Sequence, residues 1–475
     1  AYDQRYIHTP NIDRIGNEGV RFTNSFVANS ISGPSRACML TGKHSHANGF
    51  INNSTTFNGD QLTFPKLLQQ NGYQTAMIGK WHLVSDPQGF DHWEILPGQG
   101  DYYNPTFIQM NGERVQVEGY ATNIITDKAI DWIENQRDES KPFCMLLHHK
   151  APHRTWMPDT CDLELFADKT FPLPENFYDN YEGRLAAQKQ KMNIANDMEI
   201  VYDLKMADKE NEIHSGMYEK WGRGMYDGSR MTPEQKAAWD AHYDPIIAKF
   251  KKDKLTGKAL AEWKFQQYMR DYLRVITSVD RNIGRVLDYL EEKGMLENTM
   301  IVYTSDQGFY MGEHGWFDKR FMYEESFRTP LLVRLPGGKK GDVAELVQNI
   351  DYGPTILDLA GIQKPEEMQG ESFLPLLKGE KAPEWRKSLY YHFYEYPAEH
   401  MVCRHFGVRT ERYKLIHYYN DIDSWELFDL QEDPSEMNNL YGKPGTEDIT
   451  KELMAELKRL QEYYDDPIRK EIIIE

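Results

Sequence analysis

The 475-residue sequence has few cysteines and no long apolar segment. Its longest apolar stretches, such as Phe143 to Leu147, are far shorter than the roughly 20 residues that a membrane-spanning helix needs, so we expect no membrane span. The four cysteines, Cys38, Cys144, Cys161 and Cys403, lie far apart and form no CxxC pair. This spacing argues against a zinc site and against a dense disulfide framework.

Positive charge is also scarce. Lysine and arginine number 55 against 74 aspartates and glutamates, which gives a formal net charge of -19. Such a charge disfavours a broad surface for DNA or anionic lipid, so we expect no nucleic-acid partner, and any anionic ligand must be held by a few cations in a pocket. The first residues, Ala1 to Arg5, show no basic segment followed by an apolar one, so no signal peptide is visible. They are typical of the middle of a loop, and we expect a first strand upstream of the sequence shown.

What the sequence does contain is an alternation of short apolar runs and helical patterns. The runs Gln74 to Ile78, Phe143 to Leu147 and Met300 to Thr304 are typical of buried parallel strands. Helical patterns alternate with them, at Leu62 to Asn71, Thr122 to Gln136 and Tyr268 to Lys293. This order predicts an α/β fold with a large mixed, mostly parallel sheet between layers of helices. A polar cluster follows each strand, at the sheet edge where such folds bind ligands.

The chain is expected to form two domains, residues 1–382 and residues 383–475. Residues 189–264 are charged and rich in helix formers, with Pro233 after Thr232 as a helix start, so we expect a helical insertion on the rim of the larger domain. In the smaller domain, aromatic runs predict an antiparallel sheet, and the last helical pattern predicts a helix. These segments are Leu389 to Tyr394, Phe406 to Arg409, Tyr413 to Tyr418 and Asp448 to Tyr464.

The most informative segment begins Ser32-Gly33-Pro34-Ser35-Arg36 and continues to Gly42. A proline in the first turn of a helix, with Ser32 near its N-cap, would explain Ser-x-Pro but not the rest. The segment resembles the signature of sulfatases, in which the first residue is oxidised to formylglycine. The resemblance implies a formylglycine-dependent sulfatase of the serine type, with modified Ser32 as nucleophile. It also implies an alkaline-phosphatase-like fold, a catalytic larger domain and a sulfatase-maturating enzyme as partner.

The modification has a chemical reason. A plain serine that attacked sulfur would be left as a sulfate ester, which water opens slowly. A hydrated aldehyde has two hydroxyls, so one can attack sulfur while the other, once deprotonated, expels sulfate. We therefore expect the unconverted protein to be inactive.

Further motifs resemble the sulfatase pattern in the expected order, and together they cover nearly the whole chain. They are Thr9 to Ile15, Gly79-Lys80-Trp81-His82, Ala151-Pro152-His153 and Phe317-Asp318-Lys319-Arg320. The resemblance implies that Lys80 and Lys319 bind sulfate oxygens, that His82 accepts a proton and that His153 protonates the departing sugar oxygen. The catalytic set expected on this basis is Ser32, Arg36, Lys80, His82, His153 and Lys319, whose cations would surround an anion.

Two neighbouring histidines do not enter this set. His148 and His149 are adjacent on a predicted strand and would point in opposite directions, so at most one could enter the site. We assign both to the core or the rim.

Ser305-Asp306-Gln307-Gly308 resembles the metal-binding strand end of sulfatases. A carboxylate and an amide carbonyl are hard oxygen ligands of the kind that calcium prefers. The resemblance implies a calcium ion held by Asp306, Gln307 and modified Ser32. The family more often has Asn or His where Gln307 stands, and two further aspartates are expected from the upstream strand.

The sugar is indicated by a less specific resemblance. Lys150 to Arg154 and the run Tyr390 to Arg412 are similar to bacterial N-acetylglucosamine-6-sulfatases that act on mucin or heparan-type glycans. This implies a sulfated oligosaccharide as partner, cleaved at the 6-O-sulfate of a terminal N-acetylglucosamine. Next to Lys319, Asp318 and Arg320 are placed to bind ring hydroxyls as acceptor and donor. His405 could close the far side, or be a core histidine between strands.

Three alternatives remain open at this stage. The enzyme could act on another position, such as a 2-O-sulfate or the 6-O-sulfate of galactose or N-acetylgalactosamine. It could be a phosphate-ester hydrolase of the same superfamily, because a metal and a cationic pocket also suit phosphate. It could also be a catalytically silent glycan-binding homologue, if Ser32 is never oxidised. By resemblance, we expect a periplasmic or secreted protein.

Overall fold

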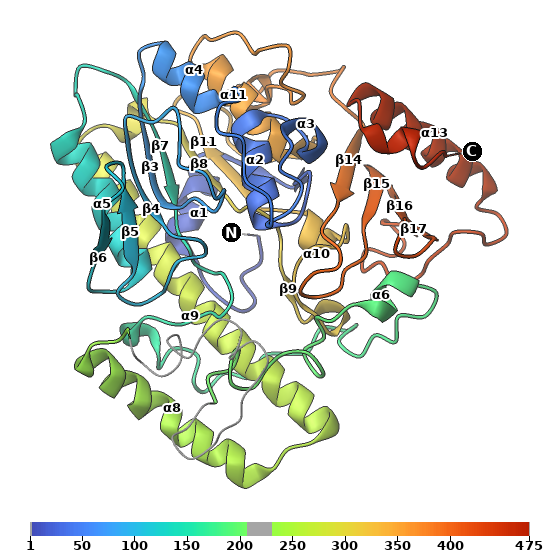
Figure 1. The fold of residues 1–475 in the computed structure, drawn as a ribbon, viewed down its shortest axis with the longest axis horizontal. Coiled ribbons are helices and arrows are strands. Elements are labelled where there is room, and N and C mark those ends of the chain that lie inside the picture. The colour runs from blue at the N-terminus through green and yellow to red at the C-terminus, as the bar shows by residue number, and fades with distance from the viewer. Residues whose placement is uncertain (1, 207–229, 475) are drawn as a thin grey trace.

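The computed structural model describes residues 2–206 and 230–474 (Figure 1). Its main mixed sheet has the strand order β6-β5-β4-β3-β7. Strand β3 is parallel to both β4 and β7, whereas β5 and β6 complete the sheet in antiparallel orientation. The bounds are β3 Gln74–Lys80, β4 His92–Leu96, β5 Thr106–Gln109, β6 Arg114–Gln116 and β7 Phe143–His148.

A second mixed sheet has the order β12-β1-β11-β8. Its strands are β1 Val20–Phe22, β8 Ile301–Thr304, β11 Leu331–Arg334 and β12 Gly341–Val343. Strand β8 pairs with β11 in antiparallel orientation, because residues 305–330 fold back beside it. The expectation of a parallel strand here is therefore wrong in orientation, although the strand itself is where the sequence placed it.

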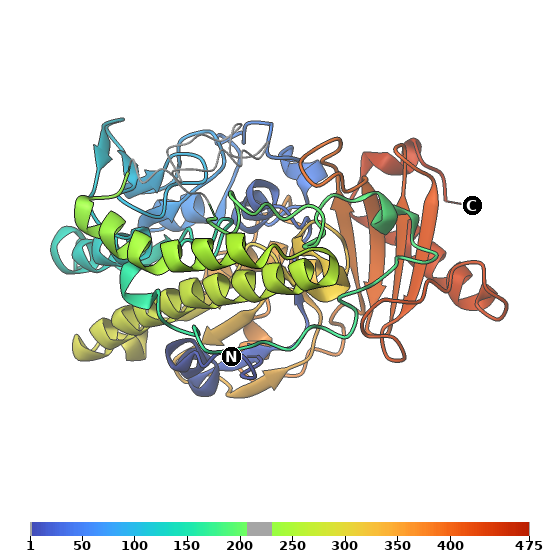
Figure 2. The same ribbon diagram turned by 90° about the horizontal axis from the view of Figure 1, so that it is seen from below.

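Helices cover these sheets, as the α/β prediction requires (Figures 1 and 2). The long helix α9 packs against α5 and α1, and apolar side chains from these helices and from β3 form a shared core. On the other side, α2, α4 and α11 pack together over a second core. The bounds are α1 Pro10–Glu18, α2 Ser32–Thr41, α4 Phe64–Gln70, α5 Ala121–Asp131, α9 Gly257–Glu292 and α11 Tyr352–Leu359. The predicted fold class is confirmed.

The insertion expected at residues 189–264 differs in detail. Helix α8 (Pro233–Asp253) begins where predicted, because Thr232 and Gln235 form a reciprocal capping box. Residues 190–206 are mostly turns, and residues 207–229 lie outside the described part. Helix α9 begins at Gly257 and not at Tyr268, since Ala261 and Phe265 extend its buried face by three turns.

The C-terminal elements form an antiparallel sheet, β14-β15-β16-β17, with helix α13 against it (Figure 1). Its elements are β14 Ser388–Phe393, β15 His405–Thr410, β16 Tyr413–Tyr418, β17 Ser424–Asp429 and α13 Glu447–Tyr463. The sequence predicted three of these strands and the helix. Ala28 and Ile350 of the larger part contribute to the same core as this sheet. The boundary at residue 382 stays a prediction.

Within the described residues, every helix is too short or too polar to cross a bilayer.

Candidate active site

The predicted catalytic residues come from elements far apart in the sequence. Ser32 is the first residue of α2, Lys80 ends β3, and Asp306 follows β8. His153 follows β7, and Lys319 follows β10 (Phe317–Asp318). Contacts and mutual charge effects join Lys80, His153, Asp306 and Lys319 with Arg36 of α2, the helix that begins at Ser32.

Ser32 is the first residue of α2 and lies one turn before Arg36. It is 1% exposed, and among the described residues its Oγ atom has no hydrogen-bond partner. The backbone N–H of Gly33 donates to Asn53 Oδ1 at 3.1 Å, which fixes the start of α2. The N-terminus of a helix favours negative charge. The position therefore suits an anionic reacting group.

Arg36 organises the floor of the site from the next turn of α2. Its guanidinium donates to Asp306 Oδ2 at 3.1 Å and to the Lys80 carbonyl oxygen at 2.7 Å. Ser35 Oγ donates to the Asp306 carbonyl oxygen. Although burial alone would raise it, the charges of Arg36 and Lys80 lower the pKa of Asp306 to about 2. Helix α2 is thus tied to the ends of both β3 and β8.

Three lysines add positive charge around this floor. Burial, reinforced by Arg36, holds the pKa of Lys80 well below its usual range. Burial lowers the pKa of Lys150 to about 8, and its Nζ lies 4.6 Å from the centre of the Tyr102 ring. Lys319 adds a third charge and is 5% exposed. Repulsion between these cations favours binding of an anion among them.

The two predicted proton-transfer histidines both lie beside these lysines. Burial and the charge of Lys80 hold the pKa of each well below its usual range. The Nδ1 atom of His153 is 2.7 Å from the Arg154 carbonyl oxygen, so Nδ1 carries a proton and Nε2 is left for exchange. His82 Nε2 is 3.1 Å from the Gln99 amide nitrogen.

The residues expected to hold the metal fit such a role. Gln307 is 8% exposed, and its Oε1 atom has no hydrogen-bond partner in the described part of the chain. Buried amide oxygens are rarely left unpaired, so this atom is available to a hydrogen-bond donor or to a metal ion. Asp306 supplies the adjacent carboxylate. Calcium takes six to eight oxygen ligands, so these two would form part of a shell.

On the sugar side, Asp318 and Arg320 contact each other. Arg320 donates to Asp318 Oδ1 at 2.9 Å, and Lys319 Nζ lies 3.2 Å from the same oxygen. Although burial would raise it, these two cations and His400 hold the pKa of Asp318 well below its usual range. Both Asp318 and Arg320 have positive φ, at 75° and 104°. This backbone is unfavourable for side-chain-bearing residues and is often found at functional sites.

The expectation that His405 closes the pocket does not fit its surroundings. His405 is fully buried, its Nδ1 is 2.8 Å from the Cys403 carbonyl oxygen, and its Nε2 accepts from the Met322 N–H. Aromatic rings surround it, including Tyr391 and Tyr418. Both ring nitrogens are used by the backbone, so His405 is a core histidine, the other interpretation that the sequence allowed.

The adjacent histidines divide as the strand geometry requires. His148 Nδ1 lies 3.2 Å from Arg36 Nη1 and 3.3 Å from the Lys80 carbonyl oxygen, so it adjoins the site. His149 Nε2 contacts Thr126 Oγ1 at 2.9 Å in the core. Burial lowers the pKa of His148 to about 3 and that of His149 to about 4.

Sequence reasoning assigned no role to several residues that line or support the site. They are Asn53, Gln99, Lys150, Glu395 and His400. Lys150 lies two residues after β7, and Glu395 and His400 lie in the run Tyr390 to Arg412, so these three fell in segments that carried a signal. The others come from loops whose course the sequence pattern does not fix.

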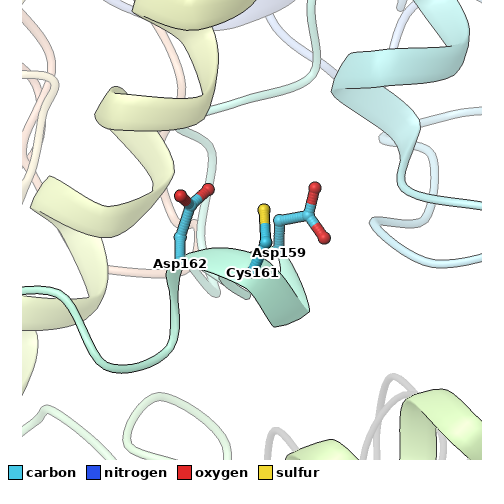
Figure 3. Close-up of side chains that lie close together, drawn as sticks. All are labelled: Asp159, Cys161 and Asp162. Carbon is cyan, nitrogen blue, oxygen red and sulfur yellow. The ribbon is translucent and has the colours of Figure 1, made fainter.

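Figure 3 shows a further group of potential metal ligands. It consists of Asp159, Cys161 and Asp162, whose ligand atoms lie within 4.8 Å of one another. Arg281 pairs with Asp162 at 2.9 Å, and Asn123 donates to Asp159 at 2.8 Å. The carboxylates are thus already satisfied by the protein.

The fold and the site place the chain among the sulfatases. Residues 1–362 match the model of the sulfatase family, and residues 312–463 match the C-terminal model of N-sulphoglucosamine sulphohydrolase. The first match covers most of the chain, so the chain belongs to the sulfatase family. Members of this family generally use formylglycine and a divalent metal ion.

Comparison with individual proteins shows which sulfatases the chain is similar to. The chain is 54% identical over 484 residues to an N-acetylglucosamine-6-O-sulfatase of Bacteroides thetaiotaomicron, a match that covers 100% of this chain and 86% of the relative. It is 27% identical to an N-acetylglucosamine-6-sulfatase of Bos taurus, over 90% of this chain and 75% of the relative. A solved structure in complex with its substrate, D-glucosamine-2-N,6-O-disulfate, matches with a TM-score of 0.93 and 54% identity. That match covers 98% of this chain and 94% of the other.

Proposed function

We propose that this protein hydrolyses the 6-O-sulfate ester of a terminal N-acetylglucosamine in glycosaminoglycan or mucin glycans. The observation that carries the proposal is the cluster of Arg36, Lys80, His153 and Lys319, whose charges act on one another. Ser32 lies one turn before Arg36 on α2, and its buried Oγ has no hydrogen-bond partner in the part of the chain that the structure describes. The 54% identity to an N-acetylglucosamine-6-O-sulfatase supports the choice of sugar and position.

Ser32 is the proposed nucleophile after conversion to formylglycine by a sulfatase-maturating enzyme. The modified residue would supply two hydroxyls on one carbon, for attack on sulfur and for release of sulfate. Ser32 lies in the first turn of α2. A sulfate bound at Ser32 would therefore lie near the N-terminal end of this helix, which favours negative charge. Lys80 and Lys319 bind the sulfate oxygens, where negative charge grows in the transition state.

The two histidines His82 and His153 transfer the protons. In the absence of substrate, burial and the charges of the neighbouring lysines hold the pKa of His153 well below its usual range. A bound sulfate ester offsets their charge, which raises the pKa of His153 and lets Nε2 take up the proton that the leaving sugar oxygen needs. His82, beside Lys80, then accepts the proton whose loss releases sulfate. Binding of the sulfate ester therefore raises the pKa of His153, the residue that then acts as the acid.

A calcium ion would be held by Asp306, Gln307 and modified Ser32, and it would polarise the sulfate oxygens. We expect exhaustive chelation to abolish most activity and added calcium to restore it, because calcium neutralises charge that the lysines alone do not. Asp306→Asn should weaken the rescue. Full activity after chelation, together with an unaffected Asp306→Asn variant, would argue against the metal site.

Asp318 and Arg320 select the sugar. In a 6-O-sulfated pyranose the hydroxyl on C4 is the ring hydroxyl nearest the sulfate arm, so residues beside Lys319 reach it first. A sugar with the opposite configuration at C4 would leave one buried polar group of the protein without a partner, which would weaken its binding by about 1–3 kcal/mol.

The test compares kcat/KM for 6-O-sulfated N-acetylglucosamine, its galacto epimer and 2-O- or 4-O-sulfated sugars. We expect the gluco 6-sulfate to be preferred at least about tenfold over its epimer. Equal rates on the two epimers would refute the sugar assignment and leave the sulfatase assignment standing.

A periplasmic or secreted location follows from the substrate, since such glycans lie outside the cytoplasm. Fractionation of cells that produce the natural precursor would test it, and recovery of the protein only from the cytoplasm would contradict it.

A further inference from the structure

The loop between β14 and β15, residues 394–404, supports the sugar-binding side of the site. Its Glu395 carboxylate is 3.9 Å from Arg320 Nε and accepts from the Asn53 N–H at 3.1 Å. Its Glu399 pairs with Arg154 at 2.5 Å. Its His400 contacts Asp318 directly. A loop from the C-terminal sheet therefore meets both residues proposed to read the sugar.

The ring of His400 is held at both nitrogens. Nδ1 lies 2.7 Å from the Lys191 carbonyl oxygen, and Nε2 lies 2.5 Å from Asp318 Oδ2. A carbonyl oxygen only accepts hydrogen bonds, so Nδ1 must carry a proton. A carboxylate also only accepts, so Nε2 must carry one as well. Two lone pairs would otherwise face each other across 2.5 Å.

The surroundings of Asp318 favour the charged arrangement. Lys319 and Arg320 both contact Oδ1, at 3.2 Å and 2.9 Å, which stabilises the carboxylate form. The negative charges of Asp318 and of Glu399, 3.9 Å from His400 Nε2, stabilise an imidazolium. Arg154 opposes this, but it is itself paired with Asp203 and Glu399. His400 is 5% exposed, so solvent screens these charges little.

We propose that His400 is a positioning residue, a buried imidazolium that locks Asp318 in the orientation needed to accept the C4 hydroxyl of the sugar. The inference rests on the proposed function. Lys319 and Arg320 contact Oδ1, whereas His400 contacts Oδ2 and so fixes the rotation of the carboxylate. A carboxylate has about four lone-pair sites, so the contacts with the two cations still leave room for a hydroxyl. His400 thereby controls discrimination at C4 without touching the substrate.

Two substitutions separate this role from a purely structural one. The amide nitrogen of Gln can take the place of Nε2 and donate to Asp318, whereas that of Asn can replace only Nδ1. We expect His400→Asn to lower kcat/KM for 6-O-sulfated N-acetylglucosamine about tenfold, mainly through KM, and to change the rate on the galacto epimer little. His400→Gln should retain most of the preference.

His405→Asn provides a matched control. His405 is another buried histidine whose two nitrogens are both hydrogen-bonded, but only to the backbone. We expect this variant to lower the melting temperature and to leave the ratio of the two rates unchanged. If His400→Asn also leaves that ratio unchanged, or lowers both rates equally, the positioning role is wrong.

The charge of His400 can be measured directly. In a spectrum of protein with nitrogen-15-labelled histidine, the signal lost in His400→Gln should be that of an imidazolium with two N–H groups. Loss of a neutral imidazole signal would overturn the proposal even if the kinetics agreed. If the wild-type enzyme shows no preference for the gluco sugar, the proposed function is refuted, and with it the role of His400 in selecting the sugar. The spectrum would still report the charge of His400 in that case.

Discussion

Excess positive charge close to one carboxylate defines the site at the scale of single residues. Asp306 pairs with Arg36, while Lys80, Lys150 and Lys319 lie near enough to lower the pKa of their neighbours. Such an arrangement is unfavourable until an anion arrives. Binding of the substrate therefore relieves repulsion that the folded protein already contains, and it does so where the reaction develops charge.

Lys319→Ala tests this view. We expect the loss of one preorganised cation to lower kcat/KM roughly a hundredfold, or about 3 kcal/mol in transition-state stabilisation, with formylglycine still formed. Lys293→Ala, which removes an exposed lysine paired with Glu134, is the control and should have no effect on the rate. An unchanged rate in Lys319→Ala would mean that this lysine does not bind the sulfate.

Single residues also show how far sequence reasoning reaches. Hydrogen bonds of Arg36 bring Lys80 and Asp306 together, which the motifs predicted to share a site. The motifs could not decide between a pocket and a core position for His405, because strand alternation gives the side of a residue but not its partners. His400 lies within the run Tyr390 to Arg412 that carried the resemblance, but in a loop without a repeating pattern, so only the structure reveals its contact with Asp318.

At the scale of elements, the close pairing of β3 with β7 positions Lys80. Gly79 has a φ of 108°, and a Cβ atom there would lie 2.0 Å from the His148 carbonyl oxygen. Only glycine permits both the backbone conformation and this approach. The glycine before Lys80 is therefore a structural requirement of the catalytic strand.

Gly79→Ala should destabilise the protein by about 3 kcal/mol or more, because the strands must separate and φ is unfavourable. Gly72→Ala is the matched control: it has a φ of 88°, but in the described part of the chain nothing lies within 4 Å of where its Cβ atom would be. It should cost only about 1–2 kcal/mol. Urea unfolding would measure both, and equal losses would show that the close approach at Gly79 is unimportant.

The elements were predictable where a repeating pattern carried them. Strands β3, β7 and β16 lie within a residue or two of their expected places. The start of α9 was missed because its first turns are charged and resemble the insertion before them. The antiparallel orientation of β8 was not predicted, because the residues of a strand do not show which distant strand it pairs with.

At the scale of the whole molecule, the C-terminal sheet is joined to the catalytic part through buried polar groups. Tyr323 OH and Tyr418 OH both donate to Glu426 Oε2, at 2.8 Å and 3.3 Å. Burial raises the pKa of Glu426 to about 7. Between pH 4.5 and 7 the folded protein thus binds a proton that the unfolded chain has lost, so this group favours folding less and less as the pH rises.

Glu426→Gln removes this titration. A shift from 4.5 to about 7 corresponds to about 3 kcal/mol. We therefore expect the variant to gain roughly 2–3 kcal/mol relative to the wild type between about pH 5 and pH 8, as measured by chemical unfolding at both values. A difference in stability that does not vary with pH would mean that Glu426 is ionised throughout.

The whole chain has a net charge of -19, but the cations of the pocket make it locally positive. The proposed catalysis in this pocket requires that Ser32 be converted to formylglycine. The most direct measurement compares preparations made with different amounts of maturating enzyme. Mass spectrometry gives the fraction of Ser32 that has lost two hydrogen atoms, and the same samples are assayed for sulfate release from 6-O-sulfated N-acetylglucosamine. We predict that activity is proportional to the converted fraction and absent in Ser32→Ala, while binding of the sugar is retained. Sulfate release by unconverted protein, or by Ser32→Ala, would contradict the account.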